Sequence, residues 1–400
     1  MTDTENKRKN DDFVPTKASL LTLLLASMLI LMGGAAVAPA LPEMAHVFSD
    51  MDGILINLVI TLPALAIILV GLVVGALADR LGKVKVLCIS LAIFFVSGVS
   101  GYFLNDLIAV LVGRFFVGVG IAGISSCCSA LISEYYHGDD RVRALGLQAA
   151  AMGIGAFVLE LAGGILADFG WHYPFLIYAL GLLLLMMAVV ALKEPSHHHE
   201  DGSAHVDGNK GYDRTLVAYC YVAIFLAMLF MFVFPSKIPE YMEQNLGSTP
   251  TVTGLMLGVL GIFNAVTSMF HKRISESVDE MHIVTVGFLS IGVAGFVFLT
   301  QPSYASITLC ALFLGVGLGL ITPAVLNILA SQCDRNNSGK IMGGYSTFFY
   351  LGQFVSTFVI ALVISLFGGL EGNVFSAICL TGLVAALGSL ALTTKVRRSR

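Results

Sequence analysis

Charged residues are scarce in this chain of 400 residues, where Asp, Glu, Lys and Arg together make up only 12%. A soluble domain carries about 25% charged and about 45–50% apolar residues. This chain is 57% hydrophobic, with a mean hydropathy of +0.88. That composition excludes an ordinary soluble protein, and no basic face suggests nucleic acid. We therefore expect an all-α integral membrane protein without a nucleic-acid partner.

The residue patterns of several enzyme and ATPase classes are also missing. No nucleotide-binding loop is present, and no His/Ser or paired-acid constellation lies inside an apolar run. Six of the seven cysteines lie in apolar runs and the seventh in a loop expected to face the cytoplasm, so no disulfide framework is implied. We expect no enzymatic activity, no cofactor and no resident metal.

Apolar stretches are what the sequence has in abundance. About 20 helical residues cross a hydrocarbon core about 30 Å thick, and twelve stretches reach that length. The predicted spans are 18–40, 53–77, 84–104, 107–133, 144–167, 173–192, 215–235, 251–270, 282–300, 305–331, 340–368 and 373–394.

Six spans lie on each side of one hydrophilic stretch, residues 193–214. This division predicts a cytoplasmic N-terminal segment (1–17), an N-terminal six-helix bundle (18–192), a cytoplasmic linker (193–214), a C-terminal six-helix bundle (215–394) and a cytoplasmic basic tail (395–400). The linker is rich in histidine and acid, so it could bind zinc or nickel. We favour a solvated tether.

Basic residues indicate the orientation, because Lys and Arg are retained on the cytoplasmic side of a membrane. With the N-terminus inside, 20 of the 22 fall in the termini and loops on that side. Lys237 lies in a predicted outer loop and Arg114 inside a span. Both termini are therefore expected in the cytoplasm, and short loops favour the cytoplasmic membrane of a prokaryote.

The most specific motif is GALADRLGKVKV, residues 75–86, between the second and third spans. It resembles the signature of the major facilitator superfamily, G-x-x-x-D-R/K-x-G-R/K-x-R/K, at every specified position. The resemblance implies two pseudo-symmetric six-helix bundles and a conformational latch in which Asp79 meets the start of the eleventh helix, near 338–340. A plain positively charged loop is the alternative. The expected latch residues are Gly75, Asp79, Arg80, Gly82, Lys83, Lys85 and Glu134.

Weaker patterns resemble the twelve-helix drug/proton antiporter branch of that superfamily. They are LVGRFFVGVG at 111–120, GWHYPF at 170–175, and Gly352 with Gln353. The fifth span departs from the antiporter pattern G-x-x-x-G-P-x-x-G-G, because Leu159 and Glu160 replace its glycine and proline. An ionisable group thus stands where the branch usually has none.

Two charges inside spans need a reason, because each costs about 2.5–3.5 kcal/mol on insertion scales. Counting eight residues from Asp106 and from Asp168 places Arg114 and Glu160 at a similar depth, roughly 12 Å inside the membrane. We therefore expect a buried ion pair in which Glu160 takes and releases a coupling proton. A permanent pair that only orients two helices is the alternative.

Taken as a set, polar and aromatic residues inside the spans predict a mostly uncharged substrate cavity, although for each residue singly helix packing or hydrogen bonding between helices is the favoured role. The candidates are Asn57, Gln148, Met231, Phe232, Phe263, Asn264, Asn327, Tyr345, Tyr350 and Gln353.

The leading functional hypothesis is a monomeric secondary transporter whose partners are a small-molecule substrate, protons and membrane lipids. Alternating access would drive proton-coupled export of a small apolar or amphipathic compound. Uptake or facilitated diffusion of a metabolite, or a non-transporting receptor, is the alternative. Pro235 and Pro239 are expected to break or kink the seventh helix near its outer end.

Overall fold

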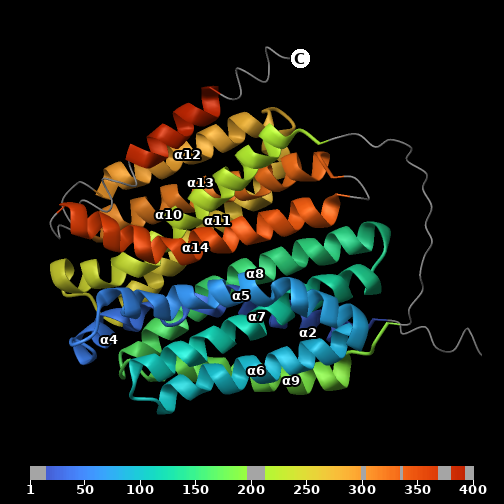
Figure 1. Cartoon of the computed structure of the whole chain (residues 1–400), viewed down its shortest axis with the longest axis horizontal. Coiled ribbons are helices and arrows are strands. Elements are labelled where there is room, and N and C mark those ends of the chain that lie inside the picture. Colours follow the sequence, from blue (N-terminus) through green and yellow to red (C-terminus); the bar gives the residue numbers. More distant parts are fainter. Residues whose placement is uncertain (1–14, 196–211, 299–302, 334–336, 368–379, 392–400) are drawn as a thin grey trace, which may run out of the picture.

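The computed structural model describes residues 15–195, 212–298, 303–333, 337–367 and 380–391, and this part of the chain folds into helices (Figure 1). Eleven of them are long and apolar enough to cross a membrane, and a shorter apolar helix spans Leu380–Ala391. The predicted all-α membrane fold is therefore confirmed. The remainder of the twelfth predicted span and the histidines of the linker lie outside the described residues.

The N-terminal helices gather into one group and the C-terminal helices into another (Figure 1). The first group comprises α2 (Lys17–Met28), α3 (Met32–Ala35), α4 (Leu41–Val47), α5 (Gly53–Leu81), α6 (Lys83–Phe103), α7 (Leu107–Tyr135), α8 (Gly138–Ala167) and α9 (Leu180–Ala191). The second comprises α10 (Arg214–Leu246), α11 (Pro250–Ser275), α12 (Glu280–Phe298), α13 (Tyr304–Ser331) and α14 (Ser338–Phe367).

Two helix pairs form the main connection between these groups, which we call the N-half and the C-half. Helix α8 packs against α11, and α5 packs against α14. We call the end where α9 ends and α10 begins the linker end. The opposite end, where α7 begins and α8 ends, is the far end.

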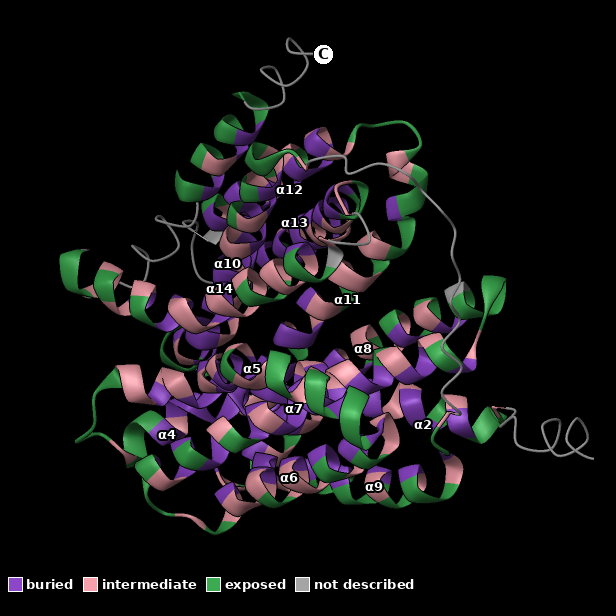
Figure 2. Cartoon of the chain, turned by 45° about the vertical axis from the view of Figure 1, so that its right-hand side comes forward, coloured by how far each residue is buried: buried purple, intermediate pink, exposed green. Residues whose placement is uncertain are grey.

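Burial follows the expected pattern for a protein in lipid. Buried residues lie where helices meet, and exposed ones lie on the periphery of both halves (Figure 2). Large apolar side chains are among the most exposed, including Val190 at 85% and Leu72 at 77%. Such surface is stable against hydrocarbon and would be costly in water.

The first span differs from the predicted uninterrupted 18–40. It extends to Val47 and is divided into α2, a 3₁₀ turn (Leu29–Leu31), α3, a second 3₁₀ turn (Ala38–Ala40) and α4. Proline contributes to the division, because Pro39 and Pro42 have no N–H to donate within a helix. The chain is also drawn close to α5, where a Cβ on Gly34 would lie 2.7 Å from the carbonyl oxygen of Ile60.

The seventh span also differs from its predicted extent. Helix α10 runs past Pro235 and Pro239 to Leu246, so the expected break does not occur. Lys237 consequently lies in a helix and not in a loop. Lys237 is only 8% exposed, and its ammonium group pairs with Glu240 at 2.8 Å.

Candidate functional site

Arg114 lies in the middle of the N-half, where 1% of its surface is exposed. Its guanidinium donates one hydrogen bond to the carbonyl oxygen of Val59 at 2.6 Å, one to the carbonyl oxygen of Gly33 and one to the hydroxyl of Tyr178. The Tyr178 hydroxyl in turn donates to the carbonyl oxygen of Met32 at 3.3 Å. One cation therefore links α7 to α3, α5 and the 3₁₀ turn that precedes α9.

The acceptors of Arg114 are carbonyl groups that the helices themselves leave free. Val59 would normally bond to the N–H four residues later, but that residue is Pro63, which has none. Gly33 loses its helical donor because the Val37 N–H turns to the carbonyl of Gly34. An unsatisfied carbonyl inside a membrane protein is costly, so Arg114 compensates for two helix defects at once.

Glu160 occupies α8, at the face that crosses α11. A Cβ on Gly254 would lie 2.5 Å from the Glu160 carbonyl oxygen, so the two backbones are in close contact. The carboxylate atom Oε2 of Glu160 is buried and has no hydrogen-bond partner. The predicted ion pair with Arg114 is not formed, because Arg114 faces α3 and α5 whereas Glu160 lies where the halves meet.

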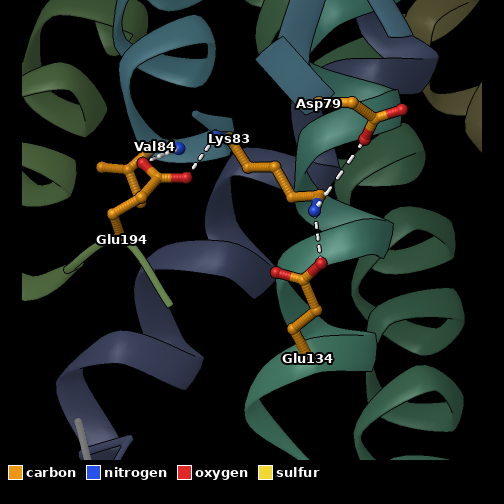
Figure 3. Close-up of polar contacts among 5 residues, drawn as sticks. All are labelled: Asp79, Lys83, Val84, Glu134 and Glu194. Carbon is orange, nitrogen blue, oxygen red and sulfur yellow. Dashed lines mark hydrogen bonds and ion pairs between the residues drawn. The ribbon is translucent and has the colours of Figure 1, made fainter. Parts of the chain in front are cut away.

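The GALADRLGKVKV motif forms a charge cluster at the linker end (Figure 3). The Lys83 ammonium pairs closely with Glu134, at the end of α7, and lies 3.9 Å from a carboxylate oxygen of Asp79. Among the predicted latch residues, Lys83 is therefore the basic residue on which the cluster is centred. The Asp79 side chain is 74% exposed. Its predicted contact with the start of the eleventh helix, near 338–340, is not among the described polar contacts.

Glu194 belongs to the same cluster and was not predicted. Its two carboxylate oxygens accept hydrogen bonds from the backbone N–H groups of Lys83 and of Val84, the latter at 3.0 Å, and so cap the start of α6 (Figure 3). Gly82 has a φ of 103°, and a Cβ there would lie 2.7 Å from the Glu194 carboxyl carbon. The motif glycine thus leaves room for the carboxylate.

A second polar cluster lies at the linker end of the C-half. The side-chain amide of Asn327 donates to Glu280 at 2.9 Å and approaches the His271 ring at 3.3 Å, while His271 and Glu280 are 3.1 Å apart. These residues come from α13, α12 and α11. In the N-half, Glu134, Lys83 and Asp79 come from α7, α6 and α5, which occupy the equivalent places in chain order.

The structure distributes the predicted cavity residues over several environments. Gln148 is 5% exposed and donates to the hydroxyls of Ser27 and Ser129, so it ties α8 into the N-half. Asn57 donates to the carbonyl of Gly53 in its own helix at 3.1 Å.

The remaining candidates lie in the C-half. Asn327 belongs to the linker-end cluster, and Gln353 is only 6% exposed. Asn264 accepts a 3.5 Å bond from Ser268 in its own helix. The half-buried candidates are Met231, Phe232, Phe263, Tyr345 and Tyr350.

The described polar contacts between the halves lie toward the far end. Thr61 and Thr357, both fully buried, share a 2.7 Å hydrogen bond between α5 and α14. His46 lies 3.7 Å from Glu243. Near the linker end, by contrast, a Cβ on Gly75 would meet no heavy atom within 4 Å.

Aspartate 168 makes the most direct of these far-end contacts. Its carboxylate accepts from the backbone N–H of Thr251 at 3.2 Å and from the Thr251 hydroxyl. Together with the other contacts, this bond shows that the halves are joined at the far end in this conformation.

Known proteins provide an independent comparison. The sequence profile of the Major Facilitator Superfamily matches residues 23–215 and 220–400. "Multidrug resistance protein 1" of Bacillus subtilis is 25% identical over 340 residues, which cover 83% of this chain and 86% of that protein. "Tetracycline resistance protein, class C" of Escherichia coli is 27% identical over 399 residues, which cover 94% of this chain and 99% of that protein.

A solved structure shares the fold. The inward open conformation of the xylose transporter XylE from E. coli superimposes with a TM-score of 0.77 at 15% identity, covering 93% of this chain and 95% of that one.

Proposed function

Because this chain belongs to the Major Facilitator Superfamily and is a multi-pass membrane transporter, not an enzyme, we propose that it exports small apolar or amphipathic compounds in exchange for protons. The relatives named for multidrug and tetracycline resistance support export of this kind of compound. The two halves, 18–192 and 215–394, would be the moving bodies of alternating access, with 193–214 as their linker.

The unpartnered carboxylate oxygen of Glu160 is the observation that carries proton coupling. A charge at this depth is expensive, and neither Arg114 nor any other described cation pairs with it. A carboxyl group without a fixed partner is free to exchange a proton when water reaches it. Because Glu160 lies on the face of α8 that crosses α11, its surroundings change when the halves move.

Arg114 takes a different role from the one expected for it. Its hydrogen bonds hold broken segments of the N-half, so we assign it to the structure of that half and not to direct proton exchange with Glu160. Among the predicted cavity residues, the half-buried aromatic residues are the better candidates for substrate contact. Tyr350 and Tyr345 both pack against Phe349 on α14, with ring centroids 5.1 and 6.0 Å apart.

The distribution of basic residues supports a cytoplasmic linker end. With that orientation, the far end faces outward, and the contacts at Asp168 and His46 belong to a conformation closed toward the outside. The residues of the Lys83 cluster then lie at the cytoplasmic surface, with Asp79 positioned to approach the start of α14 when the linker ends come together.

Proton movement in inside-out vesicles tests this proposal. Vesicles are energised to an acid interior and challenged with lipophilic cations, neutral antimicrobials and metabolites, and internal pH is followed. We expect substrate-triggered alkalinisation in the wild type and its loss in Glu160→Gln. Full proton-driven transport by a correctly folded Glu160→Gln protein would refute the role of Glu160.

Glu280 provides a contrasting control, because its carboxylate is held by Asn327 at 2.9 Å and by His271 at 3.1 Å. Glu280→Gln neutralises this partnered carboxylate at the linker end of the C-half, away from the α8–α11 crossing. We expect this variant to retain proton exchange. Substrate flux in wild type without any proton movement would instead favour facilitated diffusion.

A further inference from the structure

Asp168 has an unusual position for an acidic residue. It is the C-cap of α8, where the macrodipole presents partial negative charge and disfavours a carboxylate. Its carboxylate instead reaches the first turn of α11 in the other half, where two groups of Thr251 donate to it. The acid is thus placed unfavourably for its own helix and favourably for α11.

Helix α11 lacks the local side-chain cap that several other helices have. Its N-cap residue, Thr249, makes no side-chain cap hydrogen bond, and Pro250 follows. By contrast, Asp52, Asp106 and Asp213 each cap the helix that they precede. The acceptor missing from the start of α11 is therefore supplied across the interface between the halves.

We propose that Asp168 and Thr251 form a far-end latch, which holds the halves together in this conformation and opens when the far ends separate. The latch rests on the alternating-access part of the proposed function. It complements Asp79 at the linker end, whose side chain is exposed here beside Lys83 and would approach α14 in the opposite conformation. The two acids would be engaged alternately.

The crossing of α8 and α11 explains why the latch must open. Gly164 and Gly254 let the two backbones approach closely just inside the latch, since a Cβ on Gly254 would lie 3.1 Å from the Cα of Gly164. When the linker ends of α8 and α11 move together about this crossing, their far ends move apart. The donors of Thr251 at the start of α11 then bond to water in place of the Asp168 carboxylate.

Distance measurements by electron paramagnetic resonance in lipid nanodiscs test the latch without a substrate. In a background with the native cysteines replaced, spin labels at Asp50→Cys and Gln244→Cys report the far end, and labels at Asp139→Cys and Glu276→Cys report the linker end. All four positions are exposed. We expect Asp168→Ala to shift the equilibrium toward far-end-open molecules by about fivefold, the typical effect of losing a helix cap.

A cap that acts within one half provides the control. Asp106 accepts the Ala109 N–H at 2.8 Å and caps α7 entirely inside the N-half. Asp106→Ala removes a similar bond at the same end of the molecule and should leave both distance distributions unchanged. Equal distributions in wild type and Asp168→Ala, or the same shift in Asp106→Ala, would overturn the proposal.

A second variant tests the idea without removing Asp168, should its loss prevent folding. Thr249→Asp offers α11 a local acceptor, so the helix no longer depends on the other half. We expect the same shift toward far-end-open molecules. An unchanged distribution in this variant would also refute the latch. Because no flux is measured, failure of proton coupling at Glu160 would leave these results intact.

Discussion

Replacing Arg114 by lysine separates the charge of this residue from its geometry. Lysine keeps the positive charge, but its single ammonium group cannot reproduce the planar set of donors that spans Val59, Gly33 and Tyr178. Hydrogen bonds to charged groups contribute about 1.5–3 kcal/mol each. Losing two of three should therefore lower the free energy of unfolding by about 3–5 kcal/mol, as when a buried charge loses its partners.

The defect at Pro63 allows a stricter test. In Pro63→Ala, the new N–H can donate to the carbonyl of Val59, so this acceptor no longer depends on Arg114. We expect Arg114→Lys to cost about 1.5 kcal/mol less in the Pro63→Ala background than in wild type. The difference is the coupling energy of a double-mutant cycle.

Unfolding can be followed in mixed micelles by the fluorescence of Trp171, the single tryptophan of the chain, which is 3% exposed. Its ring packs against Phe48 at 5.3 Å, so loss of N-half packing should change its emission. A cost below about 1 kcal/mol for Arg114→Lys, or an equal cost in both backgrounds, would refute the proposed compensation. Loss of transport with unchanged stability would point to a direct functional role instead.

Two further predictions concern the linker-end cluster. Gly82→Ala should lower the free energy of unfolding by about 1–3 kcal/mol, because φ is 103° and the new Cβ would contact Glu194. Gly75→Ala is the control for the same unfolding measurement, because its new Cβ would meet no heavy atom within 4 Å. Lys83→Met and Glu134→Gln should each cost at most about 1 kcal/mol, because the ion pair is partly exposed. Since the two side chains are in contact, their costs should not add, and additive costs in a double-mutant cycle at low salt would contradict the pairing.

The sequence predicts how far along its helix a residue lies, but not which neighbouring helix its side chain faces. Apolar runs and the rise per residue place Arg114 and Glu160 at similar depths. Whether two side chains meet, however, depends on how each helix is rotated and on what packs beside it. A nearby proline could have indicated that Val59 needs a donor, but choosing Arg114 as that donor requires the packing of α5 against α7.

Contacts between distant parts of the chain were the least predictable. The motif correctly indicated a charged loop, whereas Glu194, more than a hundred residues away, carries no local sequence signal for capping α6. Of the predicted break or kink at Pro235 and Pro239, the break does not occur, because the surrounding helix packing outweighs the single-residue preference.

The anchoring of the linker has a mechanical consequence. Glu194 is held on α6, and at the other side the Asp213 N–H donates to Gln332 at 3.0 Å while its carboxylate caps α10. Each half thus fastens its own end of the connecting segment. Residues 195–212 could reach about 60 Å if extended, so tension in the tether need not transmit force. The helix faces that join the halves, and the lipid around them, can then carry mechanical work from one half to the other.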